Sequence, residues 1–223
     1  MGIDSGPNRL ERRKARTRAA LVSAAQTLLA EGKLNAPIID ITQAADVGMG
    51  SFYNHFQSRE ELFQAAVEEA LDHQGALLDM LCADVDDPAQ VFAQSFRLIG
   101  RMHRRYPTIS KVLLSKGLEL AQADSGLAPR ARRDIDAAIR SGRFVIHDPE
   151  LAMTIVSGAT LCLGQLLHHQ PERDDAEATD QVAEDLLRMF GLTTAEAHEI
   201  CRRQLPSLDV LPPNGTLDIV SWR

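Results

Sequence analysis

Three short side chains that hydrogen-bond readily, Ser51, Asn54 and His55, lie within one segment of five residues. At about 100° per residue, a helix would place them on one face. Serine can bond to several bases, and asparagine can form two hydrogen bonds to adenine, so this face suits base edges in a major groove. Tyr53, at the border of the face, and His55 match phosphate oxygens better. These residues therefore predict contacts with double-stranded DNA.

The local sequence predicts the elements that would hold this face. Residues 41–62, ITQAADVGMGSFYNHFQSREEL, indicate a short helix, a tight turn and a second helix at residues 49–56. Phe52 and Phe56 fall on a different face and are expected to pack inward. Gly48 leaves the start of the second helix unobstructed, so its free N–H groups can approach a phosphate. The residues expected to contact DNA are Thr17, Arg18, Gln43, Met49, Gly50, Ser51, Tyr53, Asn54, His55 and Arg59.

Positive charge is concentrated in the same part of the chain. The whole sequence has 24 Lys and Arg against 31 Asp and Glu, whereas residues 1–60 have eight against six. Six of those basic residues lie within residues 9–18, beside the single acidic Glu11. A local basic stretch in an acidic protein is the electrostatic footprint of a nucleic-acid contact. Taken alone, a charge run is more often a solvated helix face.

Helical periodicity runs through nearly the whole chain. From Thr17 onward, apolar residues recur at the spacing of an amphipathic helix, and Gly32 follows where a left-handed C-cap is expected. Ser58 followed by Glu61 forms a capping-box pattern. The expected fold class is all-α, with an N-terminal three-helix DNA-binding domain containing a helix-turn-helix and a larger C-terminal helical bundle. Predicted helices span residues 17–29, 38–45, 49–56, 58–81, 89–105, 108–123, 129–141, 150–169, 175–190 and 194–205, and predicted domains span residues 1–57 and 58–205, followed by a tail at 206–223.

Composition indicates an ordinary globular protein of the cytoplasm. The 223 residues allow a sizeable core, and no apolar run approaches the length that spans a bilayer. No apolar segment follows the charged N-terminus, so a secretory signal is not expected. Three cysteines without paired spacing indicate reduced, mostly buried thiols. Adjacent His168 and His169 would diverge by about 100° on a helix, so neither a metal nor a cofactor is expected.

The N-terminal stretch resembles the DNA-binding domain of the TetR family of transcriptional regulators, from about residue 16 to residue 70. The most specific part is FYNHF, an aromatic-Tyr-x-His-Phe pattern followed by a Glu-Leu helix. The downstream stretch IRSGRFVIHDPELAMTIVSGATLCLGQ is similar to that family's C-terminal domain. The matching N-terminal residues are Thr17, Arg18, Ala24, Ala25, Leu28, Gly32, Asp40, Ile41, Ala44, Ala45, Val47, Phe52, Tyr53, His55, Phe56, Ser58, Glu61 and Leu62.

Four positions depart from the family's pattern. Asp46 stands where the family usually has glycine in the turn, which costs some strain if the turn is left-handed. Gly48 stands where a serine or threonine would cap the second helix. Pro37 and Ile39 replace a common threonine and a polar or basic residue. These changes are expected to weaken phosphate anchoring and to leave the fold intact.

The resemblance implies a homodimer that binds a palindromic operator, with repression relieved by an unknown small-molecule effector in the C-terminal domain. Two recognition helices would then lie about one helical turn of DNA apart. Effector binding would change that spacing by moving the helix at residues 58–81, which joins the two domains.

Apolar helix faces in the C-terminal half supply candidates for an effector pocket and a dimer interface. The helix at residues 150–169 is apolar on more than one face, and its glycines allow close approach of another helix. Phenylalanine and leucine at helical spacing are, however, more often plain core. Pocket candidates are Phe92, Phe96, Ile99, His103, Leu113, Gly117, Leu120 and Cys162, and interface candidates are Leu151, Ile155, Gly158, Leu161, Gln165, Val182, Leu186 and Phe190.

Two alternatives belong to other functional classes: an all-α enzyme, and a small-molecule-binding protein without a DNA function. The sequence has no GxSxG, HExxH, P-loop or dinucleotide fingerprint. The three cysteines have no evident histidine partner in the sequence. The sequence therefore favours a regulator over an enzyme.

Overall fold

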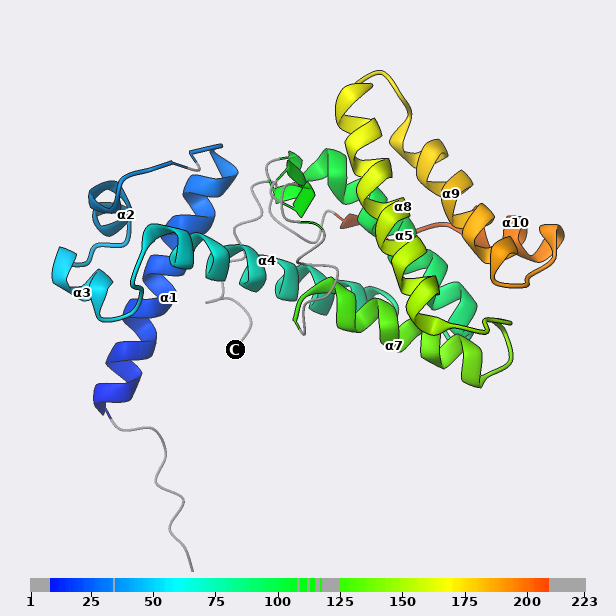
Figure 1. Ribbon diagram of the computed structural model, residues 1–223, viewed down its shortest axis with the longest axis horizontal. Helices are drawn as coiled ribbons and strands as arrows, with labels where there is room; N and C mark the ends of the chain where they lie inside the picture. The colour runs from blue at the N-terminus through cyan, green and yellow to red at the C-terminus, as the bar shows by residue number, and fades with distance from the viewer. Residues whose placement is uncertain are drawn as a thin grey trace, which may run out of the picture. The chain divides into compact units, whose positions relative to one another are not determined.

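The computed structural model describes residues 9–33, 35–107, 109–111, 113–114, 117 and 125–208, and the regular structure in those residues is helical (Figure 1). The all-α prediction is therefore confirmed. The helices are α1 (Arg9–Ala30), α2 (Ile38–Ala44), α3 (Met49–Tyr53), α4 (Arg59–Leu81), α5 (Pro88–Arg105), α7 (Leu127–Arg140), α8 (Pro149–His169), α9 (Asp175–Met189) and α10 (Thr194–Arg202).

The chain divides between Glu68 and Glu69 into two compact units. The first contains α1, α2, α3 and the start of α4, and the second contains the rest of α4 and the remaining helices. The division falls inside α4, beyond the boundary at residues 57 and 58 that the sequence suggested. Between α5 and α7, the described residues from Pro107 to Gly117 are helical, whereas the remainder of the helix predicted at residues 108–123 lies outside the described residues.

The first unit is held together by one apolar face of α1. Leu21 and Ala25 are completely buried there, together with Ile41 of α2 and Phe52 of α3. The helix α1 begins at Arg9, ahead of the start predicted at Thr17, because the basic run is made of residues with high helix propensity. The six basic residues therefore extend α1 as exposed turns beyond the packed part.

The turn between α2 and α3 has the hydrogen bonds of a Schellman motif. The N–H of Asp46 donates to the carbonyl of Gln43 over 3.1 Å, and the N–H of Val47 donates to the carbonyl of Thr42 over 3.0 Å. This motif requires a left-handed residue at its centre, and Asp46 has φ 52°. Gly32, which ends α1 at φ 76°, occupies the equivalent position without a Cβ penalty.

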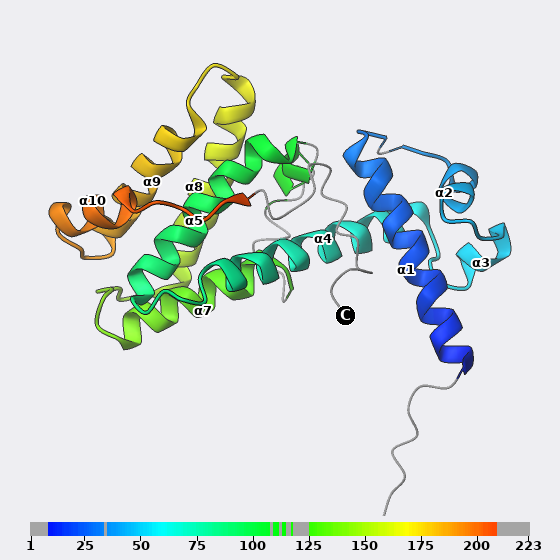
Figure 2. The same ribbon diagram turned by 180° about the vertical axis from the view of Figure 1, so that it is seen from behind.

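In the second unit, α5 is the central helix and packs against α7, α8, α9 and α10 (Figure 2). Phe92 of α5 lies at the middle of an aromatic cluster. Its ring centroid is 5.5 Å from that of Phe144 and 5.6 Å from that of Phe190, and both pairs meet edge to face. These three rings fix the loop before α8 and the end of α9 against α5.

Side-chain caps set the starts of several helices in the second unit. Asp148 accepts hydrogen bonds from the N–H groups of Glu150 and Leu151, and Pro149 follows it as the first residue of α8. Thr193 and Glu196 form a complete capping box at α10. The predicted starts of α8 and α10 are thus explained by local hydrogen bonds.

Of the described helices, α8 is the one with the length and apolar composition of a membrane span. The whole of Pro149–His169 forms one continuous helix. The core helix of a soluble protein has the same composition, and α8 packs against α5, α7 and α9.

Candidate nucleic-acid interface and internal cavity

The helix α3 carries the predicted base-reading face but is shorter than expected. It ends at Tyr53, and Asn54 is its C-cap. The N–H of Phe56 still donates to the carbonyl of Phe52 over 3.0 Å, so the chain completes one more tight turn. Asn54 and His55 therefore lie at and just beyond the end of α3, where the sequence had placed them inside a helix.

Exposure separates an inner from an outer side of this segment. Phe52 and Phe56 are buried, as expected, whereas Tyr53 is 59% exposed and Met49 is 41% exposed. A Cβ atom on Gly50 would meet nothing within 4 Å, so the surface at the start of α3 is open. The predicted contact residues Gln43 and Asn54 are exposed, and Ser51 and His55 are half-buried.

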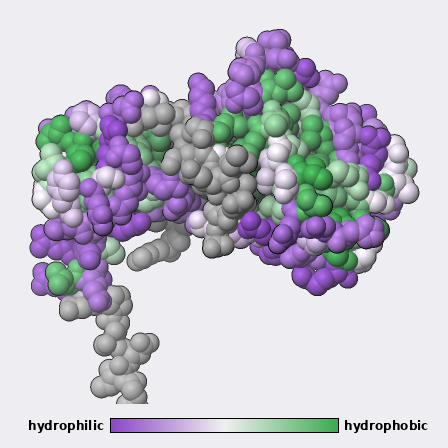
Figure 3. Space-filling model, in the orientation of Figure 1, coloured by the Kyte–Doolittle hydropathy of each residue, from purple (hydrophilic) through white to green (hydrophobic). Residues whose placement is uncertain are grey.

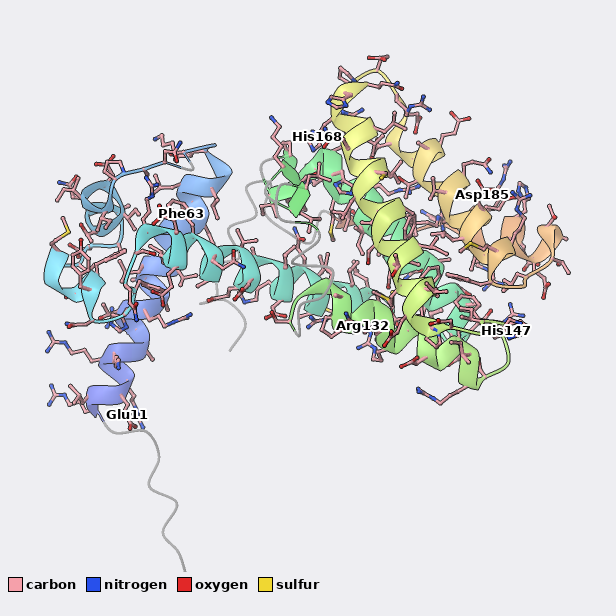
Figure 4. The ribbon with its side chains drawn as sticks, viewed as in Figure 1. Glu11, Phe63, Arg132, His147, His168 and Asp185 are labelled. Carbon is pink, nitrogen blue, oxygen red and sulfur yellow. The ribbon has the colours of Figure 1, made fainter. Side chains whose placement is uncertain are left out.

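Basic residues of α1 lie close to the end of this segment. The Arg18 guanidinium lies 5.4 Å from the centre of the Phe56 ring. The pKa of His55 is lowered, first by partial burial and then by the positive charges of Lys14 and Arg18. His55 is therefore neutral at neutral pH. Figure 4 shows the side chains of the first turns of α1, around the labelled Glu11, projecting away from the helix.

Two predicted contact residues are engaged within their own unit. The hydroxyl of Thr17 donates to the carbonyl of Arg13 over 3.1 Å. The guanidinium of Arg59 donates to the carbonyl of Asn35 over 3.2 Å and pairs with Glu60 over 2.7 Å. A phosphate contact by Arg59 would thus require the side chain to exchange partners. Ser58 accepts from the N–H of Glu61 over 3.1 Å, as the capping-box pattern predicted.

The second unit contains a cavity of about 100 Å³, partly open to solvent, between side chains of α4, α5, α7 and α8. Most of its wall is apolar, including Leu71 of α4 and Val156 of α8. An apolar cavity of about 150 Å³ admits one benzene molecule, and the volume here is about two thirds of that. Five of the predicted pocket residues line it, namely Phe92, Phe96, Ile99, Leu113 and Gly117.

The other three predicted pocket residues have different positions. His103 lines a separate cavity of about 10 Å³ that shares Ile99 and Leu113 with the cavity of about 100 Å³. Cys162 is exposed on α8, whereas Cys82 and Cys201 are buried, in line with the expectation of mostly buried thiols. Leu120 lies outside the described residues.

A cluster of charged side chains from α4 and α7 borders the cavity. Asp79, Arg130 and Asp134 are among its lining residues. Asp79 accepts from Nε of Arg130 over 3.0 Å and from the guanidinium of Arg133 over 2.6 Å. Arg133 also pairs with Asp134 over 2.8 Å. The cavity therefore combines an apolar wall with one polar edge, the arrangement typical of sites for small organic molecules.

The two carboxylates of this cluster differ in their electrostatics. Burial pushes the pKa of Asp79 upward, but hydrogen bonds from Arg133 and Arg130 outweigh burial and hold the pKa low. Asp134 is 6% exposed, and burial raises its pKa despite the hydrogen bond from Arg133. Both remain hydrogen-bond acceptors for a donor placed in the cavity.

Glycine at position 75 makes room for this cluster. A Cβ atom on Gly75 of α4 would lie 2.5 Å from Nε of Arg130. Arg130 crosses α4 at that point and also donates to the carbonyl of Gly126 over 2.7 Å. Sequence reasoning missed this polar edge. The available signal was an Arg and an Asp four residues apart on α7, at the spacing of one helix face.

The predicted dimer residues fall into three groups. On α8, Leu151 is 61% and Ile155 44% exposed, Gln165 is exposed, and a Cβ on Gly158 would meet open space. Figure 3 shows apolar surface over α8 in this view. By contrast, Leu161 lines the cavity, and Val182 is half-buried. Leu186 and Phe190 are buried in the core of the subunit, which removes them from any surface.

Comparison with known proteins identifies the two units. Residues 21–66 match the family described as bacterial regulatory proteins of the tetR family. Residues 87–203 match a tetracyclin repressor-like C-terminal domain. No curated protein matches the chain.

Solved structures agree with this assignment. The chain is similar to RolR in complex with its ligand resorcinol, with 36% identity and a TM-score of 0.66 over 88% of this chain and 98% of that one. RolR without ligand matches with 36% identity and a TM-score of 0.70 over 85% and 98%. A TetR-family regulator from Pectobacterium atrosepticum shares the fold, with 22% identity and a TM-score of 0.56 over 82% and 93%. The chain therefore belongs to the TetR family of transcriptional regulators, and it is a ligand-responsive DNA-binding repressor rather than an enzyme.

Proposed function

We propose that the protein binds a two-fold symmetric operator as a homodimer in the cytoplasm and releases it when a small, neutral hydroxylated aromatic compound enters the cavity of the second unit. The α3 segment supplies base and phosphate contacts, and the exposed face of α8 supplies the dimer contact. Each part of this proposal is supported by a different set of residues.

The DNA contact is supported by the open surface around α3. Ser51 and Asn54 carry hydrogen-bonding groups of the right size for base edges, and Tyr53 is exposed beside them. The basic turns of α1 add positive charge next to this face. We therefore expect Ser51 and Asn54 to determine sequence preference, and Tyr53, His55 and the basic residues to contact phosphates.

Fluorescence anisotropy with a labelled fragment of the DNA upstream of its own gene tests this assignment. Asn54→Ala should reduce the preference for operator over random DNA, with a loss of about 1–3 kcal/mol for the base that it contacts. Tyr53→Phe should instead weaken binding to both DNAs alike. Gln181→Ala, an exposed change on α9, serves as the control. If the protein binds neither DNA at low salt, the DNA contact is wrong.

The effector class is supported chiefly by the charged edge of an otherwise apolar cavity. A phenolic hydroxyl can donate to Asp79 or Asp134 and accept from Arg130, while the ring fills the apolar part. The arginines of the cluster are already paired with carboxylates, so the site offers no uncompensated positive charge to an anion. Resorcinol, the ligand of the similar protein RolR, is a compound of this class.

Calorimetric titration of the whole protein tests the effector class. Resorcinol should bind more tightly than 3-hydroxybenzoate, because an anion would lose its hydration in a cavity whose arginines are already paired. Asp134→Asn should weaken resorcinol binding, whereas Asp136→Asn, an exposed change two residues away on α7, should not. Equal binding of resorcinol to both variants would contradict the assignment of Asp134.

Release of DNA requires coupling between the two sites. Effector binding is expected to bias the position of α4, which contributes both to the first unit and to the cavity wall. Saturating resorcinol should then lower operator affinity at fixed salt by the same factor as operator lowers resorcinol affinity. Operator affinity that stays constant at saturation would exclude the coupling.

A further inference from the structure

The hydroxyl group of Ser110 joins two helices of the second unit. Its Oγ lies 2.6 Å from Nδ1 of His103 on α5 and 2.8 Å from Nε2 of His168 on α8. Figure 4 shows His168 at the end of α8, beside the helical residues that lie between α5 and α7. A hydroxyl carries one proton, so Ser110 donates to one imidazole and accepts from the other.

This bridge is buried and closely packed. Ser110 is 4% exposed and His103 is 2% exposed. The His103 ring packs directly on Gly164 of α8, where a Cβ atom would lie 2.4 Å from the ring. A glycine in the middle of α8 thus provides the space that the imidazole occupies.

The bridge adjoins the wall of the effector cavity. Leu113 and Gly117, which follow Ser110 in the same helical stretch, line the cavity of about 100 Å³ that Asp79 and Asp134 border. Ser110 and His103 line the cavity of about 10 Å³, whose wall includes Ile99 and Leu113 as well. Any movement of Ser110 away from its two imidazoles would therefore move residues that shape the effector site.

We propose that Ser110 is a positioning residue for the effector site: its bridge to His103 and His168 holds the cavity wall that carries Leu113 and Gly117, and acid weakens effector binding by charging that bridge. This inference rests on the proposed function, because it assumes that the effector occupies the cavity that Asp79 and Asp134 border.

The surroundings of the bridge favour neutral imidazoles. The pKa of His168 is lowered by burial first, and then by the charges of Lys111, Arg104 and His169. The pKa of His103 is lowered to about 4, mainly by burial and next by His168, although the backbone of Thr160 opposes the shift. A proton on His168 would repel the positive charge of Lys111, which follows Ser110 in the chain.

The number of protons on the two imidazoles also limits how many hydrogen bonds Ser110 can form with them. One charged imidazole can still donate to Ser110 while the hydroxyl donates to the other ring. Two charged imidazoles leave the hydroxyl proton without an acceptor in the bridge. Acid therefore first introduces repulsion at Lys111 and then removes a hydrogen bond.

Titration calorimetry of the full chain with resorcinol at pH 7.5 and pH 5.5 tests the proposal. Phenolic hydroxyls, with a pKa near 10, stay neutral at both pH values, so a change in affinity reports on the protein. Wild-type affinity should fall on acidification by roughly 2- to 5-fold, the size of one repulsion between partly exposed charges. Ser110→Ala should bind more weakly than wild type at pH 7.5, because both hydrogen bonds of the bridge are lost.

His168→Gln separates positioning from simple stability. Glutamine keeps an N–H donor for Ser110 but does not titrate, so this variant should bind like wild type at pH 7.5 and lose the pH dependence. It also decides the matter should Ser110→Ala fail to fold. His147→Gln, an exposed change before α8, should keep the wild-type profile.

Three results would overturn the proposal: wild-type binding that is equal at both pH values, a His168→Gln variant with the wild-type pH dependence, or a Ser110→Ala variant that binds like wild type. In those cases resorcinol still binds, and the effector class stands. Absence of resorcinol binding at both pH values would instead remove the effector proposal and this inference with it.

Discussion

Asp46 occupies the left-handed position of the turn before α3, where a residue with a Cβ atom introduces backbone strain. The Schellman hydrogen bonds on either side of it are intact, yet the residue at their centre has a Cβ and a positive φ. Aspartate tolerates this conformation better than most residues, but glycine adopts it without strain. The turn that orients α3 is therefore formed by hydrogen bonds that offset local strain.

Asp46→Gly should raise the free energy of unfolding of the first unit by about 0.5–1 kcal/mol, since it relieves strain at a position that already has the required φ. Denaturant unfolding monitored by circular dichroism measures the change. Asp46→Ala is the matched comparison, because it removes the same carboxylate but keeps a Cβ at positive φ. An alanine variant more stable than the glycine variant would contradict the strain argument.

The buried imidazole of His103 makes stability depend on pH. Its folded pKa of about 4 lies below the ordinary value of 6.5, so the unfolded chain binds the proton more tightly. The contribution of neutral His103 to the free energy of unfolding is therefore fully present above about pH 6.5. It is lost as pH falls toward about 4, by roughly 1 kcal/mol for each pH unit. Thermal unfolding between pH 7 and pH 5 should show this slope, and His103→Gln should reduce it.

Sequence patterns within each helix were sufficient to predict most of the helices. Contacts between side chains of different helices could not be predicted in this way. The Asp148–Pro149 pair marks the start of α8 in the sequence, and Gly32 marks the end of α1. The end of α3 was predicted too late, because Asn54 closes a helix whose pattern continues to Phe56.

The polar edge of the cavity is the other part that sequence reasoning missed. Asp79 and Arg130 come together only because the Arg130 side chain of α7 reaches across α4, where residue 75 is small enough for the arginine to cross. Periodicity places each side chain on a helix face but does not say which helix will face it. Ion pairs between charged residues that are far apart in the sequence therefore could be identified only from the structure.

The start of α8 offers a test of element stability. Asp148→Ala should lower the free energy of unfolding of the second unit by about 1 kcal/mol, because two N–H groups lose their acceptor. Asp148→Asn keeps an oxygen that can accept the same bonds and should recover most of the loss. Chemical denaturation of both variants measures the difference, and equal stability of the two would argue against capping.

At the scale of the whole molecule, the exposed apolar side chains of α8 carry the expectation of a dimer. Leu151 and Ile155 lie one helical turn apart and are exposed, and Gly158 follows them with open space at its Cβ. Such a surface suits close approach of the same helix from a second copy. Leu186 and Phe190 are not part of this surface, because they pack α9 into the hydrophobic core.

Ile155→Glu should convert the dimer to a monomer and reduce operator binding, because a charge would be buried against its own copy. Sedimentation velocity measures the oligomeric state across a range of concentrations. Val145→Glu is the control, because Val145 is 67% exposed in the loop before α8. A variant at Ile155 that remains dimeric would place the interface elsewhere.

The mutual pairing of Asp79, Arg130, Arg133 and Asp134 has a consequence for how the two binding reactions respond to ions. A neutral effector entering a site whose charges already compensate one another displaces few counterions, so its affinity should hardly vary with ionic strength. The excess of positive charge in residues 9–18 behaves oppositely, since each phosphate contact releases bound cations. Added salt should therefore lower the affinity for DNA and leave the affinity for the effector unchanged. The ionic strength of the solution would then adjust one binding equilibrium independently of the other.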